Sequence, residues 1–271
     1  MTALLKKIIL CADDYAQNED ISHGIVSAVD AGRLNAVSCL TTSAYWSDAS
    51  IDLLSRRPHV FIGLHFNLTH GLALSDAWKS RYGQYFGGLL GLLKASYFNR
   101  LDHEVLKAEC AAQLEAFRDA LGVYPDFIDG HQHVHQLPQV REAVLAVYQT
   151  NQVKGFIRNT SCDMRFSKAY VIARLGGSTF KRILDKKGIL TNASFSGVYP
   201  FRRAPDYRRY FNTFLNQSLN HGLIMCHPGN RSFDRTDPLS FSRCYELEYL
   251  MSDRFLDDLS FHGVGLVQVS R

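Results

Sequence analysis

The sequence contains no long apolar run. No stretch approaches the ~18 consecutive apolar residues that a membrane-spanning helix requires. Residues 1–14 (MTALLKKIILCADD) hold an apolar stretch that is too short, and followed too soon by charge, for the apolar core of a secretory signal peptide. We therefore expect a cytoplasmic protein without a transmembrane segment.

A strong charge of one sign and closely spaced cysteine pairs are also missing. The net charge is only +4, which is too small to indicate nucleic acid as a partner. The main basic run, within residues 202–209, is interpreted as a solvated face rather than an anion site. None of the six cysteines belongs to a C-x-x-C pair, so we expect reduced thiols in core or strand positions.

What the sequence does contain is an alternation of strand-like and helix-like segments. Helices are predicted at residues 19–31 and 102–121, and Pro138 is expected to open another. Strands are predicted at residues 6–12, 36–42, 59–69, 126–135, 155–161, 223–229 and 263–270. The chain has 271 residues, of which 46% are hydrophobic, so we predict a single domain over residues 1–271.

The order of these segments indicates the fold class. Strands that alternate with helices predict a parallel sheet, which fits either a doubly wound sheet or a barrel. Polar residues stand at the ends of many different strands, as expected for a barrel whose active site is assembled at its C-terminal face. The alternation blurs between residues 165 and 220. We therefore predict an α/β fold, namely a distorted (β/α) TIM-like barrel.

Residues 84–98 (QYFGGLLGLLKASYF) differ from their surroundings because they are apolar, aromatic and rich in glycine. Two interpretations stay open for this segment. It is either a packed insertion between core elements or a flap that covers the site and contacts an apolar part of the substrate.

Candidate chemical groups lie at the ends of four predicted strands. Asp13 and Asp14 are adjacent carboxylates whose repulsion a metal ion would relieve, although an Asp here can also cap the next helix. His65, His131 and His227 each come late in or just after a different apolar strand, and each alone could be an ordinary histidine. Because the ends of barrel strands converge on one rim, one shared site explains them better than separate causes.

The segment DGHQHVHQ (129–136) concentrates histidine. On an extended strand His131, His133 and His135 would share one face, because side chains alternate with a period of two. Asp129 is expected to orient one of these rings. One carboxylate with two imidazoles makes a three-ligand site with open positions, suited to Zn²⁺, Co²⁺ or Mn²⁺, whereas Mg²⁺ prefers oxygen.

Several short motifs run in one order and span nearly the whole chain. They are CADDY (11–15), GLHFNLTHG (63–71), FIDGHQHVH (127–135), FIRNT (156–160) and IMCHPG (224–229). With these motifs the chain resembles the YdjC-like carbohydrate deacetylases, the group that includes chitin-disaccharide deacetylases and hopanoid-associated proteins. The resemblance implies a TIM-like barrel that holds one divalent metal ion, Zn²⁺ or Mg²⁺, with Mn²⁺ and Co²⁺ also compatible.

The resemblance also implies roles for individual residues. By position, Asp14, His65 and His131 match the metal ligands. Asp13 matches the general base, and His227 matches the histidine expected to act as general acid. The implied reaction is hydrolysis of the N-acetyl group of an amino sugar.

The substrate contacts are less defined. Arg158, Tyr15 and Asp129 are the candidate substrate-binding residues, and Arg158 matches a positively charged family position. The family has Phe-Gly after the paired acids, whereas this chain has Tyr15 and Ala16, which changes the turn or the pocket floor. The aromatic side chains available for stacking on a sugar, unless they belong to the core, are Tyr15, Trp46, Phe66, Trp78, Tyr82 and Tyr85.

The expected partner is a small N-acetylated sugar, either an N-acetylglucosamine oligosaccharide or a lipid-linked or nucleotide-linked sugar, and a homodimer is left open. Two other functions also stay open. One is a metal-dependent phosphoesterase that uses the same ligands, for which Arg158 is the obvious phosphate contact. The other is a non-catalytic carbohydrate-binding member of the family, against which the intact set of candidate residues counts.

Overall fold

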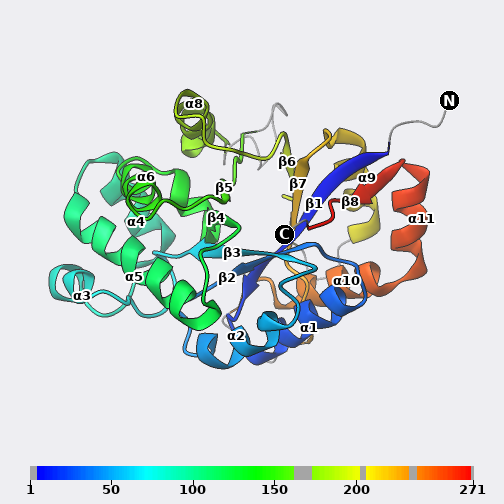
Figure 1. Cartoon of the computed structure of the whole chain (residues 1–271), viewed down its shortest axis with the longest axis horizontal. Coiled ribbons are helices and arrows are strands. Elements are labelled where there is room, and N and C mark those ends of the chain that lie inside the picture. Colours follow the sequence, from blue (N-terminus) through cyan, green and yellow to red (C-terminus); the bar gives the residue numbers. More distant parts are fainter. Residues whose placement is uncertain (1–4, 162–172, 202–205, 232–236, 270–271) are drawn as a thin grey trace.

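The structure, a computed structural model, describes residues 5–161, 173–201, 206–231 and 237–269. Among these residues, eight strands form one parallel sheet in the order β5-β4-β3-β2-β1-β7-β6, and β8 pairs with β1 outside this path. Figure 1 shows the strands at the centre of the molecule with helices around them. The strands are β1 (Lys6–Tyr15), β2 (Ala36–Cys39), β3 (Phe61–Phe66), β4 (Phe127–Gly130), β5 (Phe156–Ile157), β6 (Phe195–Ser196), β7 (Gly222–Cys226) and β8 (Val264–Leu266).

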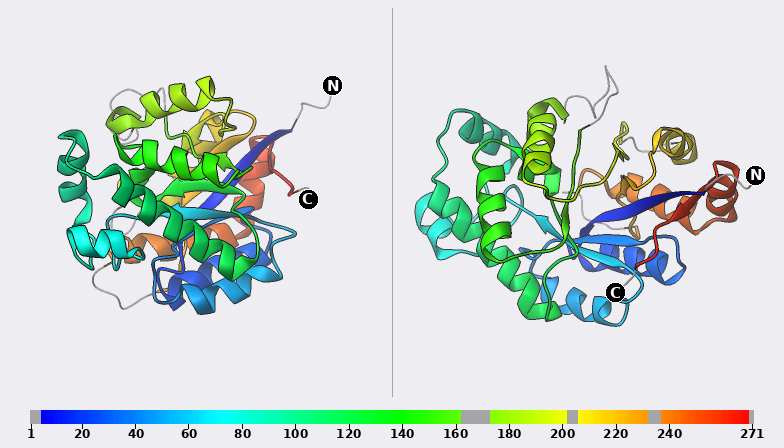
Figure 2. Two further views of the ribbon diagram at one scale, coloured as in Figure 1. Left: turned by 60° about the vertical axis from the view of Figure 1, so that its left-hand side comes forward. Right: turned by 45° about the horizontal axis from the view of Figure 1, so that its top comes forward.

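Helices follow most strands and cover the outside of the sheet, as both views in Figure 2 show. In the described part of the chain β5 and β6 are the two ends of the sheet and do not pair with each other, so the sheet forms a half-barrel. This arrangement confirms the predicted distorted barrel. The helices are α1 (Glu19–Asp30), α2 (Trp46–Leu54), α3 (Asp76–Tyr82), α4 (Gly88–Tyr97), α5 (His103–Leu121), α6 (Val140–Thr150), α8 (Ser178–Lys186), α9 (Tyr207–Gln217), α10 (Ser240–Met251) and α11 (Asp253–Phe261), with a 3₁₀ turn η1 (His131–Gln136) and a π turn η2 (Ala173–Gly177).

Strand β1 is the centre of the sheet because it pairs with three other strands. One edge pairs with β7, while the other pairs first with β8 and then with β2. Asn35 bridges the point where β8 gives way to β2. Its Oδ1 accepts from the backbone N–H of Leu10 at 2.7 Å, and its Nδ2 donates to the carbonyls of Ile8 at 3.1 Å and Val267 at 2.9 Å. The Asn35 side chain thus satisfies the Leu10 N–H and the Val267 carbonyl and adds a second bond to the Ile8 carbonyl, which also accepts from the Val267 N–H.

The predicted helix at 102–121 is confirmed as α5. Asp102 caps it by accepting from the backbone N–H groups of Glu104 and Val105, and Gly122 ends it at a φ of 71°. The helix after Pro138 begins later than predicted, at Val140, because Gln139 has a left-handed φ of 63°.

Residues 84–98 contain α4, which both packs on the core and reaches the cavity described below. Phe86 and Leu92 are buried in the core, whereas Leu90 is 76% exposed. Leu89 and Leu93 pack against the core from the same helix and also line the cavity. The segment therefore packs on the core and also borders the cavity, and its contact with a substrate stays a prediction.

The remaining sequence predictions concern membranes, thiols and basic residues. No described helix combines the length and the apolar character needed to cross a membrane. The five cysteines in the described ranges carry free thiols, and four of them are buried. Arg208 pairs with Asp258 at 2.8 Å, while Arg202 and Arg203 of the basic run, and Cys162, lie outside the described residues.

Candidate metal centre and active site

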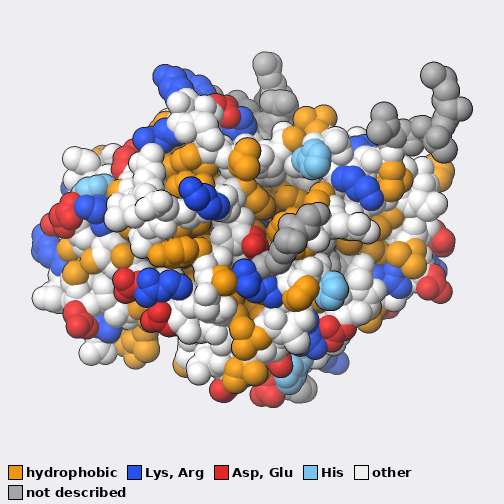
Figure 3. All heavy atoms as spheres, viewed as in Figure 1, with side chains coloured by type: hydrophobic (Ala, Val, Ile, Leu, Met, Phe, Trp, Pro, Cys, Tyr) orange, Lys and Arg blue, Asp and Glu red, His pale blue; other side chains and the backbone are white. Residues whose placement is uncertain are grey.

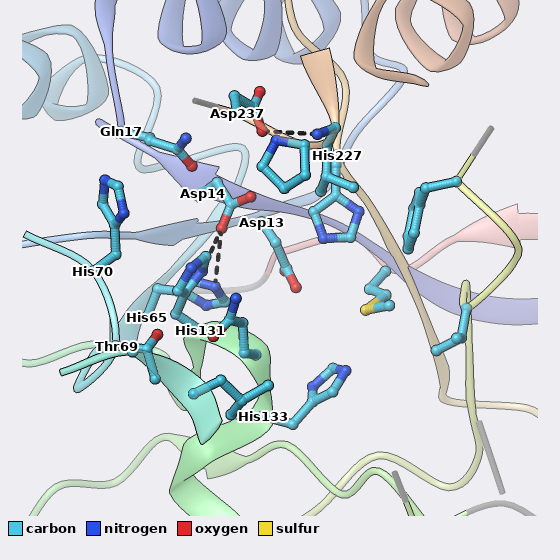
Figure 4. Close-up of a pocket in the computed structure, with 18 of the residues that line it drawn as sticks. Asp13, Asp14, Gln17, His65, Thr69, His70, His131, His133, His227 and Asp237 are labelled. Carbon is cyan, nitrogen blue, oxygen red and sulfur yellow. Dashed lines mark hydrogen bonds and ion pairs between the residues drawn. The ribbon is translucent and has the colours of Figure 1, made fainter. Parts of the chain in front are cut away.

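The carboxyl ends of β1, β3, β4 and β7 meet at one cavity of about 430 Å³. Figure 3, in the same view as Figure 1, shows hydrophobic side chains gathered near the middle of the molecule, between the positions of α6 and β7. The cavity combines such side chains with a group of acids and histidines, several of which Figure 4 labels. The hydrophobic lining residues are Leu89, Leu93, Leu137, Leu175, Val198, Phe201, Met225, Pro238 and Leu239.

A β-bulge lets two adjacent acids face the same cavity. The pairing of β1 with β2 passes from Ala12 opposite Val37 to Tyr15 opposite Cys39, so β1 carries one extra residue there. Asp14 has a left-handed φ of 66°, which breaks the alternation that would send neighbouring side chains to opposite faces. Asp13 and Asp14 consequently both line the cavity.

Asp14, His65 and His131 form one cluster from three separate strand ends. Asp14 Oδ1 lies 2.9 Å from Nδ1 of His131 and 3.3 Å from Nε2 of His65. These contacts are dashed in Figure 4. The three donor atoms lie within 4.8 Å of one another.

The cluster fits a small divalent cation. Two ligands of one tetrahedral ion at ~2.0–2.1 Å are roughly 3.3 Å apart, close to the contacts seen here. The Nδ1 of His65 contacts Asp129 Oδ1 at 2.7 Å and Ser38 Oγ at 3.0 Å, which fixes the ring with Nε2 toward Asp14. Burial raises the pKa of Asp14, but the charges of Arg243 and His131 outweigh burial and hold that pKa well below its usual range. Asp14 is therefore ready to bind a cation as a carboxylate.

Asp13 is held by a buried arginine rather than by the cluster. Both guanidinium Nη atoms of Arg158 donate to Asp13 at 2.6 Å, and Arg158 also lies 2.6 Å from Asp129 Oδ2. Burial raises the pKa of Asp13, but the adjacent Arg158 outweighs it and holds that pKa well below its usual range. Asp13 is thus an ionised carboxylate in a fixed orientation.

The formal charges around the cavity floor do not balance without a cation. Six buried charged groups of the described chain are joined there by ion pairs. Four carboxylates and two guanidiniums leave a formal charge of −2. Burial lowers the pKa of His65, but Asp129 and Asp14 outweigh burial and raise that pKa to about 10, so His65 reduces the charge to −1 when protonated. An excess of buried negative charge therefore remains that favours a cation. The six groups are the carboxylates of Asp13, Asp14, Asp129 and Asp237 and the guanidiniums of Arg158 and Arg243.

His227 follows β7 and faces Asp13 across the cavity in Figure 4. Its backbone N–H donates to Glu246 at 2.5 Å, and its ring meets the Phe201 ring edge-on at 5.4 Å. Its Nδ1 is buried and has no partner among the described residues. Burial lowers the pKa of His227 and outweighs the opposing charges of Asp14 and Asp13. Among the described residues, the ring is thus held by its backbone and by packing, and no carboxylate bonds to it.

The predicted substrate-binding residues lie behind the cavity lining rather than in it, and their role toward a substrate stays a prediction. Tyr15 is fully buried, and its hydroxyl donates to the carbonyl of Ala49 at 2.7 Å. Arg158 and Asp129 are also fully buried, behind Asp13 and His65 respectively, where they position the groups in front of them. None of the six aromatic residues proposed for stacking lines the cavity.

The predicted extended strand at 126–135 is also wrong in its second half. Strand β4 ends at Gly130, and the chain enters η1 through left-handed residues at Gln132 (φ 52°) and His133 (φ 60°). The histidines therefore separate instead of sharing one face. His131 joins the metal cluster, His133 lines the cavity, and the Nε2 of His135 contacts the Arg158 carbonyl at 3.0 Å. Asp129 orients His65 rather than any of these rings.

Arg243 and Asp237 are site residues that the sequence reasoning missed. Arg243 donates to Asp14 Oδ2 at 2.8 Å, and its Nε donates to Asp237 Oδ2 at 2.7 Å. One signal could have found Arg243, because it shares the buried face of α10 with Glu246 and Leu250. Charged residues at three-residue spacing on an apolar helix face are rarely buried unless they are paired.

Proteins named as deacetylases are similar in sequence to this chain. The sequence profile of the YdjC-like protein family matches residues 7–260. A carbohydrate deacetylase of Danio rerio is 34% identical over 145 residues, which cover 52% of this chain and 46% of that protein. A chitooligosaccharide deacetylase of Yersinia pestis (strain Pestoides F) is 28% identical over 229 residues, which cover 82% of this chain and 81% of that protein. The chain spans about half the length of the vertebrate relatives it matches.

Solved structures share the fold. An Enterococcus faecalis V583 protein named for cellobiose-phosphate cleavage superposes with a TM-score of 0.75 at 21% identity, covering 97% of both chains. The Bc1960 peptidoglycan N-acetylglucosamine deacetylase superposes with a TM-score of 0.53 at 12% identity, covering 98% of this chain and 87% of that one. At these identities the likeness extends to the fold alone.

Proposed function

The chain belongs to the YdjC-like protein family, and from that premise we propose that it is a metal-dependent hydrolase that removes the N-acetyl group from an amino sugar. The observation that carries the proposal is the placement of five groups around one cavity. Asp14, His65 and His131 make a cation site there, with Asp13 and His227 lining the same cavity. The names of the deacetylase relatives support the same reaction.

A divalent ion held by the cluster would supply a Lewis acid for the acetyl carbonyl and would acidify a water molecule. The two imidazole ligands favour Zn²⁺, Mn²⁺ or Co²⁺ over Mg²⁺, which prefers oxygen ligands, whereas the family resemblance implies Zn²⁺ or Mg²⁺.

The proposed acid–base steps use residues of this chain. Asp13 accepts the proton of the attacking water, and Arg158 keeps its carboxylate oriented during that transfer. His227 donates a proton to the departing amine nitrogen. Because burial lowers the pKa of His227, its protonated form is a more acidic donor than a free imidazolium.

The cavity lining bears on the substrate. The proposed substrate is an N-acetylglucosamine oligosaccharide or a lipid-linked N-acetyl sugar. Leu89 and Leu93 of α4 face the same cavity as the acids, so a sugar bound at the cluster would have its remaining parts against an apolar wall. This wall supports a substrate that carries an apolar group.

The alternatives have less support. A phosphoesterase would need a free cation for the phosphate, but Arg158 and Arg243 are both engaged in ion pairs with carboxylates. A non-catalytic binding protein would not need Asp13 and His227 beside the cluster.

The experiment is an assay of product release after chelation and reloading. The protein is stripped of metal, reloaded with Zn²⁺, Mn²⁺, Co²⁺ or Mg²⁺, and given N-acetylglucosamine oligosaccharides, alkyl glycosides of N-acetylglucosamine and an aryl phosphate. We expect acetate release that requires metal. Phosphate release without acetate would indicate the phosphoesterase, and sugar binding without either product would indicate the binding protein.

A further inference from the structure

The two oxygens of the Asp14 carboxylate have different neighbours. Oδ1 faces the two histidines of the cluster, at 2.9 Å from His131 and 3.3 Å from His65. Oδ2 accepts from Arg243 Nη2 at 2.8 Å. A carboxylate can bind a cation through one oxygen or through both. An oxygen that already accepts from a buried guanidinium is a weaker and more hindered ligand than the free one.

Arg243 is itself held in place from several sides. The side chain is 1% exposed, and its Nε donates to Asp237 Oδ2 at 2.7 Å. Its Nη2 also contacts Gln17 Oε1 at 3.3 Å. The Arg243 backbone carbonyl accepts from Gly229 N–H at 3.3 Å, so α10 is bonded to the segment that follows His227. Arg243 therefore cannot leave Asp14 without disrupting several buried contacts.

We infer that Arg243 is a positioning residue that restricts Asp14 to binding the metal ion through one oxygen. The inference rests on the proposed function, because only a hydrolytic metal needs coordination positions kept open for water and substrate. A bidentate Asp14 would occupy one of those positions. Arg243 thereby acts on the reaction through Asp14, across 229 residues of sequence.

Two roles for Arg243 predict opposite effects on metal affinity. If Arg243 only supported the fold around the cluster, its removal would weaken metal binding together with activity. If it restricts Asp14, its removal frees Oδ2 and takes a positive charge away from the cation. Metal binding then stays as tight or becomes tighter, while turnover is lost.

The experiment compares Arg243→Met with Arg208→Met in the full chain. Arg208, whose side chain is 46% exposed, pairs with Asp258 on the α9–α11 side outside the cavity lining, so it controls for the loss of an arginine ion pair away from the site. Zn²⁺ affinity is measured by calorimetry on the chelated protein, and kcat and KM are measured on the best acetylated substrate. The visible absorption of the Co²⁺-loaded protein reports the coordination of the ion.

For Arg243→Met we expect kcat to fall by about 10–100-fold, the range seen when a group behind a metal ligand is lost, with Zn²⁺ affinity at least as high as in the unchanged protein. The Co²⁺ spectrum should change, whereas Arg208→Met should leave all three readouts as they were. Weaker Zn²⁺ binding by about tenfold or more, or a kcat close to that of the unchanged protein, would overturn the inference.

Two further variants keep the test decisive if Arg243→Met does not fold. Arg243→Lys keeps the positive charge but loses the planar guanidinium that can donate to two acceptors at once. Its kcat should lie between that of Arg243→Met and that of the unchanged protein. Asp237→Asn loosens Arg243 without touching Asp14, and should move the Co²⁺ spectrum in the same direction as Arg243→Met. If the unchanged protein releases no acetate from any sugar, the proposed function fails, while Zn²⁺ affinities and Co²⁺ spectra still decide the role of Arg243.

Discussion

Replacing Asp13 with Asn would remove the proposed proton acceptor while hardly changing the volume of the side chain. Loss of a general base typically costs about 10²–10⁴-fold in rate, which is roughly 2.7–5.5 kcal/mol of transition-state stabilisation. The metal cluster should survive, because Asp13 makes no hydrogen bond or ion pair with Asp14, His65 or His131 and is held instead by Arg158.

The cost of Asp13→Asn in stability follows from the same contacts. An Asn at this position can accept from only one of the two Arg158 donors, since its amide group is itself a donor. Arg158 keeps its ion pair with Asp129 at 2.6 Å, so the guanidinium does not become an unpaired buried charge. We therefore expect a loss of about 1.5–3 kcal/mol, typical of one hydrogen bond to a charged group, rather than the larger cost of an orphaned ion.

The assay measures acetate release, bound metal and thermal unfolding in parallel. Asp258→Asn is the matched control, because Asp258 also accepts two bonds from one arginine, at 2.9 and 2.8 Å, but lies outside the cavity lining. It should lose stability and keep its rate. A metal-loaded Asp13→Asn protein that keeps a rate close to the original would refute the assignment of Asp13 as the base.

Three other expectations can be measured on the same protein. Ala16 has a left-handed φ of 70° and is fully buried in the core. A β-branched side chain is strongly disfavoured at such a φ and would also overpack the core, so Ala16→Val should lower Tm by several degrees, and an unchanged or higher Tm would contradict this. Without metal, burial lowers the pKa of His65, but Asp129 and Asp14 outweigh burial and raise that pKa to about 10. Below that pH a metal ion must displace a proton from His65, so metal affinity should rise with pH. Calorimetry in buffers of different ionisation enthalpy should detect this proton release, and its absence would argue against His65 as a ligand. Leu93 lines the cavity, whereas Leu90 is 76% exposed. Leu93→Ser should therefore lower kcat/KM for an alkyl glycoside more than for the plain sugar. Leu90→Ser should leave kcat/KM unchanged for both substrates.

Local sequence patterns were sufficient for the fold class and for the neighbourhood of the site. Strands that alternate with helices require a parallel sheet, and parallel strands bring their carboxyl ends to one edge. The polar residues at the ends of β1, β3, β4 and β7 therefore had to lie near one another. The structure accordingly brings Asp14, His65 and His131 within bonding distance. The helix α5 could be predicted because apolar residues recur at helical spacing from Leu106 to Leu121 and Gly122 follows them, both of which are local signals.

The tertiary structure alone decided how each side chain is oriented and what stands behind it. A period-two pattern of histidines predicted a strand, but η1 replaces it after Gly130 and only His131 joins the cluster. Tyr15 was expected in the pocket, yet the bulge at Asp14 turns its side chain into the core. Arg243 has no local signature as a neighbour of Asp14, because contacts between residues this far apart depend on how whole helices pack on the sheet. The sequence by itself thus determined which groups could meet at the metal centre, while long-range packing determined which oxygen and which nitrogen each of them presents.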